Sequence, residues 1–155
     1  VKVYAVALYL NEGSKLWGAS TTVPALLKEA PGKASLQLVI TSSLVTQAKL
    51  ADALTESLRP RLEKLGLKQE EASKVLADFG NIFAKGPRMK KGTVILFKFE
   101  KNGLKVTIGK SYSAQMKHKA LARALLSTYV DAKAVSPYFR SAIFSNLAAD
   151  SLGAN

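Results

Sequence analysis

The sequence predicts a single α+β domain in which helices pack on one face of a largely antiparallel sheet. Segments rich in β-branched and aromatic residues open the chain, helix-period segments follow, and a hairpin signal precedes two further helix-period segments. The length of 155 residues suits one domain with its own core, and neither an internal repeat nor a linker is visible. One domain over 1–155 is therefore expected.

The first two strands are predicted from composition. Residues 1–10, VKVYAVALYL, are almost continuously apolar, which is typical of a central strand covered on both faces. One or two helical turns are expected over 23–29, and Pro31-Gly32 then breaks the chain. Residues 35–41, SLQLVIT, form the second predicted strand.

Two amphipathic helices are expected next. Apolar residues recur at three- and four-residue steps from Thr46 to Gly66, which indicates one buried stripe. Pro60 lies inside that pattern, and because proline lacks a backbone N–H donor we expect a kink there or two abutting helices. The buried face of the next helix is expected to contain Ala72, Val75, Leu76, Phe79 and Phe83.

A hairpin is predicted over 93–109. Asn102-Gly103 is the preferred pair for a two-residue type I′ loop, in which both positions need positive φ. Pairing outward from that loop places Phe99 opposite Val106 and leaves one face of the hairpin apolar and the other polar.

Two helices are predicted to close the chain. The first starts at about Ser113, and the second has Ser136 as its N-cap, Pro137 at its first helical position and its end at Gly153. The buried face of the first is expected to contain Met116, Leu121, Leu125 and Tyr129.

The net charge of +12 suits an anionic partner or a solvated basic surface. The densest basic group lies in the loop 85–91 without an aromatic residue among its charges, so a base-stacking nucleic-acid site is not supported. The sequence has no cysteine and one histidine, His118, which excludes disulfides and a multi-histidine metal site within these residues. We expect His118 on an exposed basic helix face.

The sequence has no cofactor or catalytic motif. It lacks a Gly-rich phosphate loop and a run of about 18 apolar residues that could span a membrane. What remains is a hydroxyl inside an apolar strand, Tyr4, with Thr41 and Ser42 at the end of the second strand. The pattern favours a core tyrosine with a hydrogen-bond partner, although an apolar cavity ending in such a hydroxyl would suit a long chain that carries a carboxylate.

Four stretches, in this order, resemble the chalcone isomerase-like family. They are VKVYAVALYL, SLQLVIT with ADALTESLRPRL, FGNIFAKGPRMKKGTVILFKF with its NG hairpin, and ALARALLSTYVDAKAVSPYFRSAI. The resemblance extends over about residues 1–147 and implies the open-faced sandwich of that family. Within the family, the chain is more similar to the plant fatty-acid-binding branch than to working isomerases.

The resemblance also implies the site. The threonine on the opening strand of the isomerases is a tyrosine in fatty-acid-binding members, and this position is Tyr4 here. Thr41, Leu50 and Ser57 stand where the isomerases have lysine, tyrosine and asparagine, while Thr128 retains a late threonine. These replacements remove groups that would stabilise the charged transition state of cyclisation, and they make the cleft more apolar. The implied ligand-binding residues are Tyr4, Thr41, Leu50, Leu54, Ser57 and Thr128.

The implied function is non-catalytic binding of a free fatty acid of about C12 to C18, at about 0.8 kcal/mol per buried methylene. Its carboxylate would be held by Tyr4 and by an arginine upstream of the opening strand. Val1 already stands in a strand pattern, so we expect further strands upstream of it, with this arginine among them and a plastid transit peptide before them. Without the upstream strands, the sheet would have an exposed edge. The implied location is the plastid stroma, with the mitochondrion as the alternative. A chalcone isomerase, a non-catalytic auxiliary of flavonoid synthesis and a haem-binding mitochondrial relative stay open as alternatives.

Overall fold

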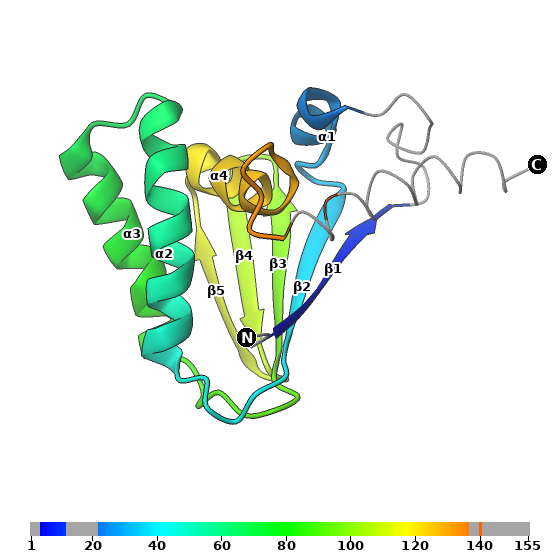
Figure 1. Cartoon of the computed structure of the whole chain (residues 1–155), viewed down its shortest axis with the longest axis vertical. Coiled ribbons are helices and arrows are strands. Elements are labelled where there is room, and N and C mark those ends of the chain that lie inside the picture. The colour runs from blue at the N-terminus through cyan, green and yellow to red at the C-terminus, as the bar shows by residue number, and fades with distance from the viewer. Residues whose placement is uncertain (1–3, 12–21, 137–139, 141–155) are drawn as a thin grey trace, which may run out of the picture.

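The computed structural model describes residues 4–11, 22–136 and 140, which form five strands and four helices (Figure 1). The five strands form one sheet in the order β1-β2-β3-β4-β5, and every neighbouring pair is antiparallel. The strands are β1 (Tyr4–Leu10), β2 (Ala34–Ile40), β3 (Val94–Glu100), β4 (Gly103–Ile108) and β5 (Tyr112–Met116). The helices are α1 (Val23–Glu29), α2 (Gln47–Lys64), α3 (Gln69–Ala84) and α4 (Lys119–Val130).

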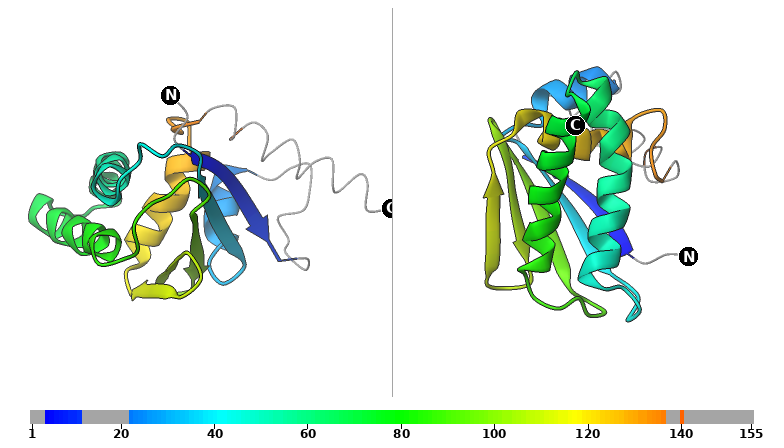
Figure 2. Two further views of the ribbon diagram at one scale, coloured as in Figure 1. Left: turned by 90° about the horizontal axis from the view of Figure 1, so that it is seen from below. Right: turned by 90° about the vertical axis from the view of Figure 1, so that its left-hand side faces the viewer.

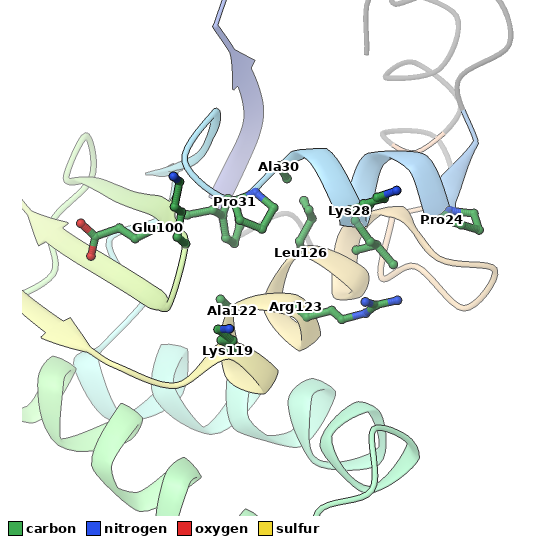
Figure 3. A pocket seen from close by; sticks show the side chains of 12 residues that line it. Pro24, Lys28, Ala30, Pro31, Glu100, Lys119, Ala122, Arg123 and Leu126 are labelled. Atoms are coloured by element: carbon green, nitrogen blue, oxygen red, sulfur yellow. The ribbon is translucent and has the colours of Figure 1, made fainter. Parts of the chain in front are cut away.

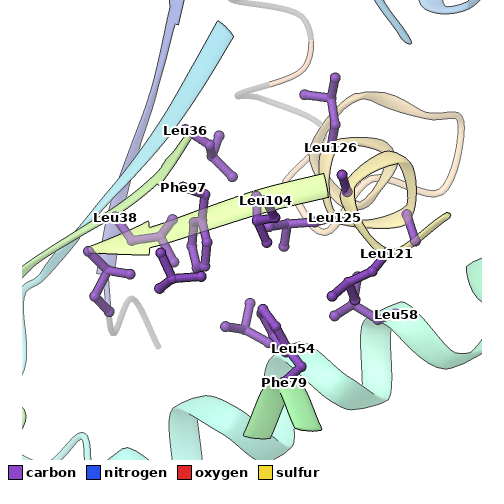
Figure 4. Packing of buried hydrophobic residues seen from close by; sticks show 14 of the residues in the cluster. Leu36, Leu38, Leu54, Leu58, Phe79, Phe97, Leu104, Leu121, Leu125 and Leu126 are labelled. Atoms are coloured by element: carbon purple, nitrogen blue, oxygen red, sulfur yellow. The ribbon is translucent and has the colours of Figure 1, made fainter. Parts of the chain in front are cut away.

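The helices lie on one face of the sheet (Figure 2). Alternate strand residues point into the layer between sheet and helices, where Leu36 lies beside Phe97 and Leu38 beside Ile95. Leu54, Leu58 and Phe79 close this core from the helix side (Figure 4). The predicted α+β open-faced sandwich is thereby confirmed.

Helix α2 is continuous through Pro60, so the alternative of two abutting helices is wrong. It begins at Thr46, whose side chain accepts a hydrogen bond from the Lys49 backbone N–H at 3.1 Å. Leu58 and Leu62 flank the proline and are both fully buried. Packing of the apolar stripe on both sides of Pro60 therefore offsets the backbone hydrogen bond that the proline removes.

Side chains fix the ends of α2 and α3 relative to each other. The Gln47 amide donates to the carbonyl oxygens of Phe83 at 2.9 Å and Gly86 at 2.8 Å. The Tyr112 hydroxyl donates to the carbonyl oxygen of Ile82 at 2.8 Å. Helix C-termini leave carbonyls without intrahelical partners, and these contacts satisfy them while tying α3 to α2 and to β5.

The hairpin forms, but its predicted loop and register are wrong. Glu100 pairs with Gly103 and Phe99 with Leu104, so the loop residues are Lys101 and Asn102. No non-glycine residue in the described ranges has a positive φ, which rules out the type I′ conformation at the loop. Because the shift amounts to two residues, each side chain keeps its predicted face.

Gly103 is required for close approach and not for its φ. A Cβ at this position would overlap the Met116 carbonyl oxygen and lie 2.9 Å from the Lys117 Cα. The chain crosses there from β5 towards α4, directly over the first residue of β4. The sequence alone does not distinguish a glycine that is required for a close backbone contact from one that is required for a turn.

The helix expected from Ser113 is wrong at its start, because 112–116 form β5. Tyr112, Ala114 and Met116 pack against the core while the residues between them are exposed, which is the period of a strand. Helix α4 begins after His118, whose Nδ1 accepts a hydrogen bond from the Leu121 backbone N–H at 3.1 Å. His118 is therefore the N-cap of α4, and its expected place on an exposed helix face is wrong.

Strand β1 is the edge of the described sheet, so the expectation of a central strand does not hold within these residues. Tyr4 and Val6 pack against the core on the inner face, whereas the outward-facing Tyr9 is 53% exposed. The closing helix predicted from Ser136 to Gly153 lies outside the described residues, apart from Ser136 and Arg140.

Candidate ligand-binding site

Two tyrosines meet between the edge of the sheet and helix α4. The Tyr4 and Tyr129 hydroxyl oxygens are 3.0 Å apart, and the rings make an edge-to-face contact with centroids 6.5 Å apart. Tyr4 is placed on the inner face by its pairing opposite Ile40, and Tyr129 is fully buried in the last turn of α4. The hydroxyl partner expected for Tyr4 is thus a second tyrosine, 125 residues away in the chain.

Burial, reinforced by the neighbouring Tyr4, raises the pKa of Tyr129 well above the ordinary value of 10.0. Tyr129 therefore stays a neutral hydrogen-bond donor and acceptor at physiological pH. In a pair of hydroxyls, one donates to the other. When Tyr129 donates to Tyr4, the Tyr4 proton is left for a third group, and Tyr4 is the member of the pair that reaches solvent.

A cavity of about 290 Å³ adjoins Tyr4 and is called the tyrosine cavity below. It lies between the start of β1, the loop 41–46 and the first turns of α2. It brings together Tyr4, an apolar wall and the cationic residue Lys49. Its lining residues are Tyr4, Ser42, Leu44, Val45, Lys49, Leu50 and Ala53.

The structure brings two of the predicted site residues together, because Tyr4 and Leu50 line the same cavity. Leu54 is buried one turn further along α2, and Ser57 is half-buried one turn beyond that. Thr128 is buried on α4 and donates its hydroxyl to the Ala124 carbonyl oxygen at 2.9 Å.

Thr41 is exposed at the start of the loop that follows β2, outside the cavity lining. The sequence interpretation missed Lys49 and the pairing role of Tyr129. The rule that a buried tyrosine has a hydroxyl partner, applied to Tyr4 there, would have drawn attention to Tyr129 as well.

The end of α4 that carries Tyr129 is held by Arg61 of α2. The Arg61 guanidinium donates from Nε to Asp131 Oδ2 at 2.9 Å and from Nη2 to Asp131 Oδ1 at 3.0 Å. It also donates to the carbonyl oxygens of Ser57 at 2.7 Å and Lys133 at 2.8 Å. This two-pronged ion pair fixes α4 against α2 and so fixes the position of Tyr129.

The described residues contain no group of three or more His, Cys, Asp or Glu side chains that could hold a metal ion. Within the same residues, no helix has the length and apolarity that crossing a membrane requires.

Replacing Tyr129 with phenylalanine is expected to change how stability depends on alkaline pH. In the unfolded chain Tyr129 ionises near its ordinary pKa of 10.0, whereas in the native state it stays protonated. The unfolded state then binds fewer protons, so stability falls as pH rises past that value. Between about pH 9 and pH 11 the wild type should lose about 1.4 kcal/mol more of its unfolding free energy than Tyr129→Phe.

Urea denaturation at several pH values measures this difference. Tyr9→Phe is the matched control, since that side chain is 53% exposed, and its difference from the wild type should stay constant. A Tyr129→Phe difference that also stays constant with pH would contradict the prediction.

The sequence matches the family described as chalcone isomerase-like over residues 1–144. Among solved structures, the fold is similar to that of a fatty-acid binding protein of Arabidopsis thaliana, with a TM-score of 0.78 and 19% sequence identity. That similarity covers 98% of this chain and 81% of the other. Among curated proteins, none is significantly similar to the chain in sequence.

Proposed function

The chain belongs to the chalcone isomerase-like family, and on that basis we propose that it binds a free fatty acid in the tyrosine cavity without transforming it. The observation that carries the proposal is the composition of the cavity, in which apolar side chains lie beside Tyr4 and Lys49. A fatty acid has the matching parts, an apolar chain and one carboxylate. The likeness to a fatty-acid binding protein supports the same ligand class.

The carboxylate lies at the Tyr4 end in this proposal. Tyr4 donates its hydroxyl proton to one carboxylate oxygen, while Tyr129 holds the Tyr4 oxygen from behind at 3.0 Å. Lys49, on the rim of the cavity, supplies the compensating positive charge. The upstream arginine implied by the resemblance stays a prediction, and it is compatible with Lys49 as a second cation.

The acyl chain lies against Val45, Leu50 and Ala53. Each buried methylene contributes about 0.8 kcal/mol, so the apolar wall supplies most of the affinity while the polar end sets the orientation. The cavity volume of about 290 Å³ is near the lower end for ligand pockets, which suits a single chain better than a fused ring system. The length range of about C12 to C18 stays a prediction.

The lining also supports binding over catalysis. Leu50, which stands where the isomerases have a tyrosine, contributes only an apolar surface. Thr41, at the position of the isomerase lysine, is exposed and lies outside the lining. Location in the plastid stroma, or alternatively in the mitochondrion, stays a prediction.

Removing the polar end of the cavity should weaken laurate binding. Tyr4→Phe deletes the hydroxyl that faces the ligand, and Lys49→Gln deletes the charge, so each variant should lower the affinity about tenfold. Isothermal titration calorimetry with laurate measures the loss. The matched controls are Tyr9→Phe and Lys64→Gln, which change exposed residues outside the cavity and should bind laurate like the wild type.

Equal affinity in Tyr4→Phe and the wild type would exclude the proposed carboxylate position. A chalcone cyclisation assay, followed by absorbance, tests the catalytic alternative on the same samples. Turnover clearly above the spontaneous rate that is lost in Tyr4→Phe would replace the binding proposal by an isomerase. If purified protein releases no fatty acid on solvent extraction and is not stabilised by added laurate, the ligand class itself is wrong.

A further inference from the structure

A second cavity, of about 500 Å³, lies at the opposite end of the sheet from Tyr4 and is called the basic cavity below. Tyr4 pairs with Ile40 at the end of β2, whereas Lys98, one residue before Phe99, pairs with Ser35 at its beginning. The cavity is enclosed by α1, the turn between β3 and β4, and α4 (Figure 3). Its apolar lining consists of Pro24, Leu27, Ala30, Pro31, Phe99, Ala122 and Leu126.

Four cationic side chains surround this apolar floor, and they come from three separate elements. Lys28 lies on α1, Lys101 in the β3–β4 turn, and Lys119 and Arg123 on α4. Figure 3 shows Lys28 and Arg123 extending from facing helices to the same side of the cavity. Because the chain brings these charges together from positions up to 95 residues apart, their clustering is a product of the fold.

The nearby carboxylates do not neutralise these charges. Glu29, the acidic residue of α1, is paired with Lys33 at 2.8 Å, and α4 contains no acidic residue. Glu100 lines the cavity but accepts a hydrogen bond from Gln115 at 3.1 Å, and its carboxylate points away from the two helices (Figure 3). In the described part of the chain, no ion pair involves any of the four cations.

We propose that the basic cavity binds a phosphomonoester amphiphile, with the phosphate among the four cations and the alkyl part on the apolar floor. A phosphomonoester carries close to two negative charges at neutral pH and three acceptor oxygens, which a guanidinium and several ammonium groups engage together. A single carboxylate would leave most of this positive charge uncompensated. The volume of about 500 Å³ lies within the usual range for small-molecule pockets, which leaves room for an alkyl group beside the phosphate.

The probe for this site is dodecyl phosphate below its micellar concentration, titrated calorimetrically into protein saturated with laurate. Saturation fills the tyrosine cavity, so remaining phosphate-probe binding reports the second site. The double variant Lys119→Gln/Arg123→Gln should bind the probe about tenfold more weakly or worse, and the wild-type affinity should fall with added salt. The matched control is Lys74→Gln/Lys90→Gln, a pair of exposed lysines outside the cavity that should leave probe affinity unchanged.

Two further ligands separate the sources of the phosphate. Inorganic phosphate, which has no alkyl part, should bind about tenfold more weakly than dodecyl phosphate. At a salt concentration that screens the general attraction of the +12 chain to an anionic surface, flotation with phosphatidate vesicles should recover little protein, since the apolar floor lies inside a cavity between elements. Equal affinity for inorganic phosphate, or vesicle binding in preference to the monomeric probe, would overturn the proposal.

Absence of probe binding, or equal weakening by both double variants, would also overturn it. The laurate saturation rests on the proposed function, but the variants keep the two outcomes distinguishable, because Lys119→Gln/Arg123→Gln changes the basic cavity alone and Tyr4→Phe changes the tyrosine cavity alone. Protein that binds dodecyl phosphate but not laurate would retain this inference and lose the first proposal. Laurate binding without phosphate-probe binding would do the reverse.

Discussion

Replacing Arg61 with methionine is expected to lower the free energy of unfolding by about 3 kcal/mol, measured by urea denaturation. The Arg61 side chain is 12% exposed and makes four hydrogen bonds, two of them to the Asp131 carboxylate. Methionine keeps much of the apolar stem but leaves Asp131 without its charged partner, which is the costly outcome for a largely buried ion pair. Arg61→Lys should be destabilised by more than half as much, because an ammonium lacks the planar pair of N–H groups that binds both carboxylate oxygens of Asp131.

Arg59→Met provides the matched control on the same helix. Arg59 is exposed and makes one side-chain hydrogen bond, to Ser73 at 3.1 Å, so its loss should cost less than about 1 kcal/mol. Because Arg61 also fixes the end of α4 that carries Tyr129, Arg61→Met should weaken laurate binding while Arg59→Met leaves it unchanged. Equal destabilisation by the two variants would show that the Arg61–Asp131 ion pair contributes no more to stability than a contact on the surface.

Gly103→Ala is expected to destabilise the protein by about 3 kcal/mol, although it adds a single methyl group. The new Cβ would overlap the Met116 carbonyl oxygen and lie 2.9 Å from the Lys117 Cα, and both are backbone atoms that no rotamer change can move. Relief requires the β5–α4 connection to shift away from β4. That connection carries His118, the N-cap of α4, so the helix start should be perturbed as well.

Gly80→Ala is the control of opposite sign. Gly80 lies inside α3, and a Cβ there meets nothing within 4 Å. Alanine should therefore stabilise the protein by about 0.5–1 kcal/mol through its better helix propensity. Thermal or urea denaturation of the two variants gives the comparison, and a mild Gly103→Ala effect would mean that the chain crossing at Met116 can relax.

Local patterns predicted the elements whose side-chain period matches their burial. The apolar stripe of α2 and the buried face of α3 follow directly from residue spacing, as does the alternation along β2. The same patterns gave a wrong prediction where a strand and a helix are both compatible with the spacing of the apolar residues. Residues 112–116 alternate over only five positions, too few to separate a strand from the beginning of the adjoining helix.

The hairpin shows a different kind of failure. Asn102-Gly103 is a strong local turn signal, yet the loop forms one residue earlier and Gly103 belongs to β4. Gly103 instead lies against the Met116–His118 segment, which no window around the hairpin contains. The local turn signal therefore did not fix the register of β3 against β4, while the face of each side chain was correctly predicted from its period of two.

The sequence by itself determined the α+β class and the apolar faces that form the core. These properties depend on neighbours a few residues apart, whose geometry the backbone fixes. Only the tertiary structure paired Tyr4 with Tyr129, placed Lys49 in the same cavity lining as Tyr4 and gathered Lys28, Lys101, Lys119 and Arg123 around a second cavity. Such sites join residues from distant segments, so their geometry arises from the packing of helices on the sheet and from contacts such as the Arg61–Asp131 ion pair. Local periodicity in the sequence does not encode these contacts.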